Sequence, residues 1–393
     1  MSLTEPSRDE LVARATALVP FLRGNAERVE NERQIGEDTI AALRDAGLLR
    51  LAVPKRFGGY EADLGTQVAV LSEIGRGDGA PAWVAGLYTG AAALVGRFGE
   101  QAQQDVWGSN PDAIICGASG SVGVGTRVEG GYLLNGAWSN SSGSLYAQWG
   151  TIGMMTTDES GEVQGGIALV DRTKFTIKDT WYVSGLNGTG SVTMVGEDVF
   201  VPDHRVMFRS GPEDNFRRTP FDDEALYHVA FIPMGNAVVA GGVLGMAKAA
   251  LEYVLQKAPT KGISDTTYRS HVDAPTAQIG IARAATLIRA AEAMVDAVVA
   301  DVMRYAERGE DMPEVERAAR RLDLTWAGKT LREAVDGLVS VSGAGSFALA
   351  NPLQRILRNV SVATRHSYMN FEIAEEIYGK KLLGNDEVVA GVI

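Results

Sequence analysis

Cysteine and histidine are scarce in this sequence. Cys116 is the only cysteine among 393 residues, so an internal disulfide and a cysteine-rich metal cluster are both excluded. The same scarcity fits a reducing compartment, and we expect the protein in the cytoplasm. The four histidines do not combine with cysteine or carboxylates at the spacing of metal ligands. The sequence therefore predicts no metal site.

The sequence also has fewer basic than acidic residues. Lys and Arg total 37 against 49 Asp and Glu, which gives a formal net charge of -12 and makes broad attraction to nucleic acid or an anionic membrane unfavourable. Residues 1–9 lack the basic and apolar regions of a signal peptide. Residues 79–96 carry no charge, but their low hydrophobicity favours a buried helix over a membrane span. We expect a soluble protein.

The common nucleotide and hydrolase motifs are missing. Gly328-Lys329-Thr330 resembles the end of a phosphate-binding loop, but Asp323 stands where that loop needs a glycine, and the triplet lies in a helical pattern. Residues 117–125 are rich in glycine without the G-x-G-x-x-G spacing or a following helix, which argues against a Rossmann site. The sequence also lacks a G-x-S-x-G nucleophile elbow.

Hydrophobic periodicity divides the chain into three parts. Helical spacing of apolar residues prevails to about residue 107, and Ser7 with Glu10 forms a predicted capping box at its start. Short apolar runs from 113 to 201 alternate with Gly, Asn, Asp and Ser clusters, which indicates strands of an antiparallel barrel or sandwich. Long apolar helices return after about residue 221 and predict a bundle. The predicted class is α+β, with domains at 1–111, 112–221 and 222–393.

Three segments carry a family resemblance when they are taken in order. They are residues 53–59 (VPKRFGG), 132–143 (YLLNGAWSNSSG) and 185–202, which begins GLNGTGS and ends EDVFVP. Together they resemble the acyl-CoA dehydrogenase superfamily over nearly the whole chain. The resemblance implies an N-terminal helical domain, a middle antiparallel β domain and a C-terminal four-helix bundle. It also implies a flavin between the last two domains and a homotetramer.

Within that superfamily the sequence is more similar to the two-component, flavin-dependent monooxygenase branch. Residues 138–143 (WSNSSG) resemble its W-x-aromatic-S-S-G segment, although Asn140 stands in place of the aromatic, and residues 80–84 (APAWV) resemble a second signal of the branch. Such enzymes take reduced FMN or FAD from a separate flavin reductase. They react it with O2 to form a C4a-hydroperoxyflavin.

The resemblance also implies which residues hold the flavin. It places Ser142 or Ser141 near flavin N5, and it places Trp138 and Thr189 at the flavin site. Arg269 resembles a residue that grips the flavin phosphate of a neighbouring subunit. Without the resemblance each has a simpler explanation, because Ser-Ser-Gly is a common turn, Trp138 suits a strand core, and Arg269 suits a solvated surface.

The choice of reaction depends on residues 355–367. An acyl-CoA dehydrogenase removes a proton with a glutamate, and matching the preceding family segment to residues 358–360 puts Ser367 at that position. The family's alternative base position falls near Gly235. Neither place offers a carboxylate, so dehydrogenation lacks its proton acceptor. His366 has an ordinary pKa near neutrality, and the resemblance makes it the candidate base that deprotonates a phenol.

The predicted function is hydroxylation of an aromatic, phenolic or polyketide-like small molecule by a flavin-dependent monooxygenase. Three alternatives stay open: N-oxygenation of an amino sugar, with His366 deprotonating an ammonium; an acyl-CoA dehydrogenase with FAD; and a flavin-free scaffold. On spacing alone, His366 is a helix-end histidine that interacts with the helix dipole. Arg355, Arg358 and Arg365 suit either phosphate binding or ion pairs, and we expect ion pairs for most of them.

Overall fold

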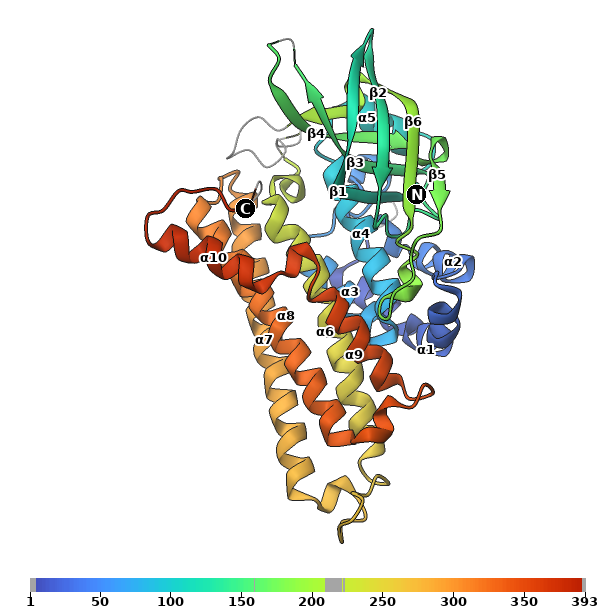
Figure 1. Ribbon diagram of the computed structural model, residues 1–393, viewed down its shortest axis with the longest axis vertical. Helices are drawn as coiled ribbons and strands as arrows, with labels where there is room; N and C mark the ends of the chain where they lie inside the picture. Colours follow the sequence, from blue (N-terminus) through green and yellow to red (C-terminus); the bar gives the residue numbers. More distant parts are fainter. Residues whose placement is uncertain (1–4, 159, 209–220, 222, 391–393) are drawn as a thin grey trace.

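The computed structural model describes residues 5–158, 160–208, 221 and 223–390. The chain forms helices, then a sheet, then helices again (Figure 1), which confirms the predicted α+β class. The sheet lies at one end of the molecule, and the long C-terminal helices extend away from it. The helices that precede the sheet are α1 (Arg8–Glu32), α2 (Glu37–Asp45), α3 (Leu64–Gly77), α4 (Gly79–Val95) and α5 (Glu100–Trp107).

Polar side chains set the starts of these helices. Ser7 accepts a hydrogen bond from the Glu10 main chain, and the Glu10 carboxylate accepts one from Ser7 N at 2.7 Å, so the predicted capping box is confirmed. Asp78 starts α4 by accepting from Gly79 N at 2.8 Å. The uncharged helix α4 is buried, as its sequence predicted, and it packs against α3, α6 and the sheet. Helix α4 therefore contacts the N-terminal helices, the sheet and the C-terminal helices at once.

The sheet is mixed, which corrects the antiparallel prediction for one pair of strands. Among the described residues seven strands follow the order β5-β6-β2-β1-β3-β4-β7, and β1 and β3 run parallel while the other neighbours run antiparallel. The segment 139–148 carries the chain from β2 back across β1, so β3 runs in the same direction as β1. The strands are β1 (Ile115–Val128), β2 (Gly131–Trp138), β3 (Trp149–Thr157), β4 (Val163–Asp171), β5 (Thr176–Lys178), β6 (Thr193–Pro202) and β7 (Val206–Phe208).

The glycine-rich segment 117–125 is part of β1 rather than a loop. Its glycines make room for large side chains of the neighbouring strands. A Cβ on Gly123 would overlap the ring of Trp138, and one on Gly125 would overlap the end of Met154. The glycines therefore serve packing of the sheet core, and a phosphate-binding function is not needed to explain them.

The C-terminal helices form the predicted bundle around α6. This helix packs against α3, α4, α7, α8 and α9. By length and composition α6 is apolar enough to cross a membrane, but 72% of its most apolar window is buried inside the protein, as for a core helix. The helices of this part are α6 (Phe231–Lys257), α7 (Pro275–Glu307), α8 (Glu314–Ser342), α9 (Pro352–Ala363) and α10 (Phe371–Leu382).

A loop of the β domain docks directly onto α9. Leu186 N donates to Asn359 Oδ1 at 2.7 Å, and the backbone at Gly185 comes so close to Arg358 O that a Cβ would not fit. Arg358 and Arg355 both pair with Glu30 of α1, at 2.6 and 3.5 Å. These contacts fix the end of α9 and the residues that follow it between the β domain and α4.

Candidate active site

His366 follows α9 and begins the short 3-10 helix η9 (Ser367–Met369). Its half-buried ring lies between two aromatic side chains. The centroid-to-centroid distance is 5.1 Å to Trp83 on α4 and 5.3 Å to Tyr368, and both contacts are edge-on. The ring is therefore held in one orientation by packing from two sides.

The surroundings of His366 keep it neutral. Burial lowers its pKa to about 4, so the imidazole carries no charge at neutral pH. Its Nδ1 accepts a hydrogen bond from Tyr368 N at 3.3 Å, and in that tautomer Nε2 carries the proton. The other tautomer would place Nδ1–H against Tyr368 N–H, so it requires this 3.3 Å contact to open. His366 therefore presents a donor at Nε2 in this structure, and it becomes an acceptor there once that contact opens.

A chain of hydrogen bonds joins Trp83 to the residues predicted for flavin binding. Trp83 Nε1 donates to Ser142 Oγ at 3.2 Å, Ser142 Oγ lies 2.6 Å from Ser191 Oγ, and Ser191 Oγ lies 2.7 Å from Thr189 Oγ1. Thr189 in turn donates to the main-chain oxygen of Leu186 at 2.8 Å. All three hydroxyl residues are at least 95% buried.

The last bond fixes the direction of every other bond in this hydroxyl chain. A hydroxyl has one proton, and Thr189 gives its proton to a carbonyl, so Ser191 must donate to Thr189. Ser142 must then donate to Ser191, and it accepts from Trp83. Ser142 Oγ therefore has no proton left and one free lone pair, which makes it an acceptor for a further group.

The turn that carries Ser142 has a shape that its sequence demands. Asn140 has φ 58° and Gly143 has φ 72°, a region that asparagine and glycine tolerate better than aromatic residues do. Asparagine therefore suits position 140 in this turn. Tyr88 of α4 donates to Gly143 O at 2.7 Å, and a Cβ on Gly143 would collide with its ring. The turn is thus anchored on α4.

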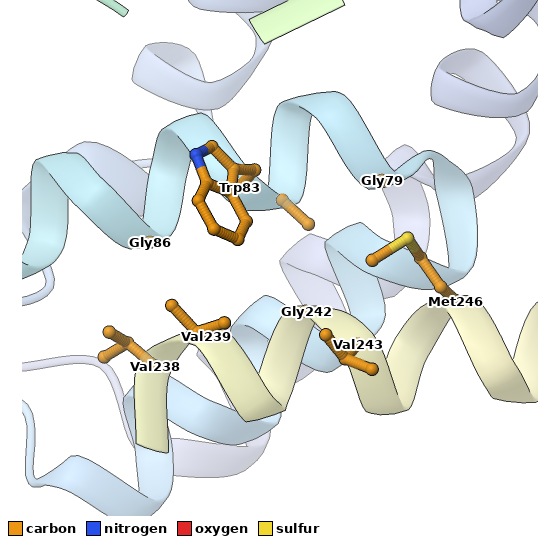
Figure 2. A pocket seen from close by; sticks show the side chains of 9 residues that line it. Gly79, Trp83, Gly86, Val238, Val239, Gly242, Val243 and Met246 are labelled. Atoms are coloured by element: carbon orange, nitrogen blue, oxygen red, sulfur yellow. The ribbon is translucent and has the colours of Figure 1, made fainter. Parts of the chain in front are cut away.

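A small apolar cavity lies between α4 and α6, beside Trp83. Figure 2 shows the Trp83 indole projecting from α4 toward α6, with Val239 and Val243 on the facing helix. The cavity volume is about 10 Å³, which is room for about one water. An aromatic ring would enter only if neighbouring side chains moved. The lining residues are Gly79, Ala82, Trp83, Gly86, Val238, Val239, Gly242, Val243 and Met246.

The structure brings together part of the predicted site. His366, Ser142 and Thr189 are joined through Trp83 and Ser191, as described above. Ser141 is fully buried and donates to Trp138 O at 2.8 Å, so its hydroxyl holds the turn.

Two other predicted residues lie elsewhere in the chain. Trp138 is fully buried in the β-domain core, where its indole donates to Gly153 O at 2.8 Å and meets Phe175. It therefore does not line the cavity, and its role beside flavin stays a prediction. Arg269 is exposed in segment 258–274 between α6 and α7, at the far end of the bundle from the sheet (Figure 1). A role toward a neighbouring subunit likewise stays a prediction.

Several residues near the site were not predicted from the sequence. Ser144 Oγ is buried and has no hydrogen-bond partner among the described residues. Tyr368 packs against His366, and its main-chain oxygen accepts from Asn236 Nδ2 at 2.7 Å. For Asn236, the sequence offered one signal, which is a polar residue in a strongly apolar helix. Asp78, next to the cavity residue Gly79, is buried, and burial raises its pKa to about 7.

The arginines before His366 behave mainly as ion-pair partners. Arg355 and Arg358 pair with Glu30, as expected. Arg365 donates to Ser361 O at 2.9 Å. His204 contacts Asp105 at 2.7 Å, a structural role in keeping with its place after a strand.

Comparison with known proteins places these features in context. Residues 15–109 match the family model for the acyl-CoA dehydrogenase N-terminal domain, and residues 237–371 match the model for the C-terminal domain. The chain is 32% identical over 368 residues to the flavin-dependent monooxygenase oxygenase subunit HsaA of Rhodococcus jostii (strain RHA1), covering 93% of this chain and 96% of that protein.

Two further relatives agree. The chain is 31% identical over 393 residues to the oxygenase component of the FADH(2)-dependent resorcinol hydroxylase of Rhizobium sp. (strain MTP-10005), covering 95% of this chain and 94% of the relative. Its structure is similar to XiaF from Streptomyces sp. in complex with FADH2 and glycerol. That match has a TM-score of 0.91 and 31% identity, and it covers 98% of this chain and 97% of the other.

Proposed function

The chain belongs to the acyl-CoA dehydrogenase family and, within it, to the flavin-dependent monooxygenases, and from this premise we propose that it hydroxylates a phenolic small molecule. It would use O2 and reduced FMN or FAD from a separate flavin reductase. One observation carries the assignment of the site. The Trp83 indole contacts His366 with its ring and Ser142 with its N–H, at the edge of an apolar cavity.

The residues present fit a reduced flavin. When bound, the flavin supplies the electrons that activate O2. Ser142 Oγ has a free lone pair, so it suits the N5–H of a reduced flavin, which is a donor. The buried, unpartnered hydroxyl of Ser144 in the same turn offers a further polar contact. Ser141 and Thr189 would hold the turn and the hydroxyl chain in place.

His366 would act on the phenol as a neutral imidazole. A phenol has a pKa of about 10, roughly 6 units above the value of about 4 for His366. Ionising the phenol in advance would cost about 8 kcal/mol at that difference. His366 would therefore hydrogen-bond the substrate hydroxyl and take its proton as the ring is attacked, when the hydroxyl becomes more acidic.

Two observations favour a phenol over the alternatives. The cavity is lined by apolar side chains and the indole of Trp83, and an ammonium placed there would be costly to desolvate, which disfavours N-oxygenation. Dehydrogenation needs a carboxylate base. The two family positions for that base are occupied by Ser367 and Gly235, which have no carboxylate.

The experiment that tests the proposal uses the full chain with reduced flavin. Protein and reduced FMN or FAD are mixed anaerobically with resorcinol as probe, then with O2, and hydroxylated product and H2O2 are quantified. Product formation that depends on protein and on reduced flavin is expected. Reduction of a dye by an acyl-CoA, with no product from any phenol tested, would contradict the proposal and favour a dehydrogenase.

The assembly is proposed as a cytoplasmic homotetramer in which Arg269 binds the flavin phosphate of a neighbour. The exposure of Arg269 at the distal end of the bundle supports this. Light scattering should give about four times the chain mass of 41.8 kDa. Arg269→Ala should weaken flavin binding without altering assembly, and a monomer in solution would contradict the proposal.

A further inference from the structure

One polar side chain stands on the cavity side of an otherwise apolar segment of α6. From Phe231 to Ala247 only Asn236 has a polar side chain, and it is fully buried. It lies three residues before Val239 and seven before Val243, which is about two helical turns. Both valines line the cavity. Asn236 therefore lies on the same face of α6 as these two valines, one helical turn before the cavity.

The amide of Asn236 is satisfied by the protein at one end only. Its Nδ2 donates to Tyr368 O at 2.7 Å, two residues after His366. Its Oδ1 is buried and has no hydrogen-bond partner among the described residues. A buried amide oxygen without a partner retains the full cost of its desolvation. Its Oδ1 is therefore available to accept a hydrogen bond from a bound molecule.

The His366 turn rests directly on this part of α6. A Cβ on Gly235 would lie 3.2 Å from Cε2 of Tyr368, which shows how closely the Tyr368 ring approaches the helix. The His366 ring meanwhile faces Trp83 across the site. Asn236 thus lies between the turn that carries His366 and the wall of the cavity.

We infer that Asn236 selects for a second hydroxyl group on the aromatic substrate. Its Oδ1 accepts a hydrogen bond from that hydroxyl, and its Nδ2 holds the turn that positions His366. The inference rests on the proposed function and adds a substrate class to it, a dihydroxylated ring rather than a simple phenol. A site with a buried acceptor rejects an analogue that lacks the donor, because the acceptor then stays unpaired.

The test compares three probes that differ only in hydroxyl groups. Resorcinol, 3-methoxyphenol and 1,3-dimethoxybenzene are titrated calorimetrically into the full-length protein with oxidised FMN or FAD present. The wild type should bind resorcinol about 10-fold or more tightly than 3-methoxyphenol. Asn236→Leu, which keeps the size and loses both polar atoms, should reduce that ratio to about twofold or less while still binding 3-methoxyphenol.

A matched control lies on α3. Gln67 is also fully buried, its Nε2 donates to Ala62 O at 2.7 Å, and its Oε1 has no partner among the described residues. Neither Gln67 nor Asn236 is itself a lining residue of the cavity. Gln67 lies on α3 and bonds Ala62, whereas Asn236 shares a face of α6 with the lining valines and bonds the His366 turn, so Gln67→Met should leave the ratio at its wild-type value. Asn236→Asp retains an oxygen at the same position, and burial keeps the new carboxyl neutral, so that its O–H can still donate to Tyr368 O. It should keep the preference for resorcinol even if Asn236→Leu does not fold.

Each outcome decides the matter. An unchanged ratio in Asn236→Leu, an equal loss in Gln67→Met, or a full loss in Asn236→Asp would overturn the role of Oδ1 and leave the proposed function standing. A wild type that binds none of the three probes would overturn the proposed function together with this inference.

Discussion

Ser142→Ala interrupts the hydroxyl chain at the residue that we propose as the partner of flavin N5. Ser142 is 4% exposed, so water does not readily replace the lost hydroxyl. Trp83 Nε1 loses its acceptor at 3.2 Å, and Ser191 Oγ loses its donor at 2.6 Å. Two neutral hydrogen bonds contribute about 1 kcal/mol each, so the free energy of unfolding should fall by about 2 kcal/mol.

The functional effect should exceed what this instability explains. The lone pair that would accept from flavin N5–H disappears with the hydroxyl of Ser142. One such bond is worth about 1.4 kcal/mol at the reacting centre, which corresponds to about tenfold in rate. Loss of that bond should let activated oxygen escape as H2O2. We therefore expect the ratio of hydroxylated product to H2O2 to fall about tenfold.

A single-turnover assay measures this ratio, with product determined by chromatography and H2O2 by a peroxidase-coupled dye. Ser141→Ala is the matched control. It lies in the same turn and loses one buried hydrogen bond, to Trp138 O at 2.8 Å, but the hydroxyl chain stays intact. A wild-type product ratio in Ser142→Ala, or an equal fall in Ser141→Ala, would refute the assignment of Ser142.

Three further changes test the cavity, the histidine and the buried acid. Gly86→Ala places a methyl group in the cavity at ordinary contact, 3.6 Å from Leu71 Cδ1, so KM for phenols should rise severalfold. Gly90→Ala on the same helix is the control, because its new methyl group meets nothing within 4 Å. Equal KM values in the two variants would argue against the cavity as the binding site. His366→Asn should lower hydroxylation about 100-fold while reduced flavin is still oxidised to give H2O2, and loss of both activities together would indicate a structural role. The pKa of Asp78 is raised from 3.8 to about 7 in the folded chain, so its contribution to stability is fully present below pH 3.8 and is lost as the pH rises through 7. Asp78→Asn keeps the helix cap and removes this pH dependence. In thermal melts, the Tm difference between Asp78→Asn and the wild type should therefore be roughly 4 °C larger at pH 8 than at pH 5. An equal Tm difference at both pH values would contradict the raised pKa.

Local sequence patterns were sufficient to predict the order of helices and strands. The capping box at Ser7 and the uncharged helix at 79–95 depend on neighbouring residues only, and both are confirmed. The parallel pairing of β1 with β3 was not predictable in this way, because it depends on where segment 139–148 crosses the sheet. The role of the glycines at 117–125 was not predictable from local sequence either, because they make room for Trp138 and Met154 on other strands.

For the candidate site, the sequence predicted individual residues but not the contacts between them. His366 and Ser142 were identified individually through family resemblance, but no pattern indicated that Trp83 would join them. Ser142 and Trp83 are 59 positions apart in the sequence, and His366 reaches the indole from the far end of the chain. Asn236 could have been noticed as a lone polar residue in an apolar helix, but its bond to Tyr368 O depends on the packing of η9 against α6.

The direction of the hydroxyl chain has a consequence for proton traffic. A relay of hydroxyls moves a proton only if its last member can pass the proton on, and this relay ends at Leu186 O, a peptide carbonyl that does not release protons to solvent. If Ser142 contacts flavin as proposed, Ser142, Ser191 and Thr189 would conduct no proton away from the flavin. A proton released at the substrate would then leave on the opposite side, through His366.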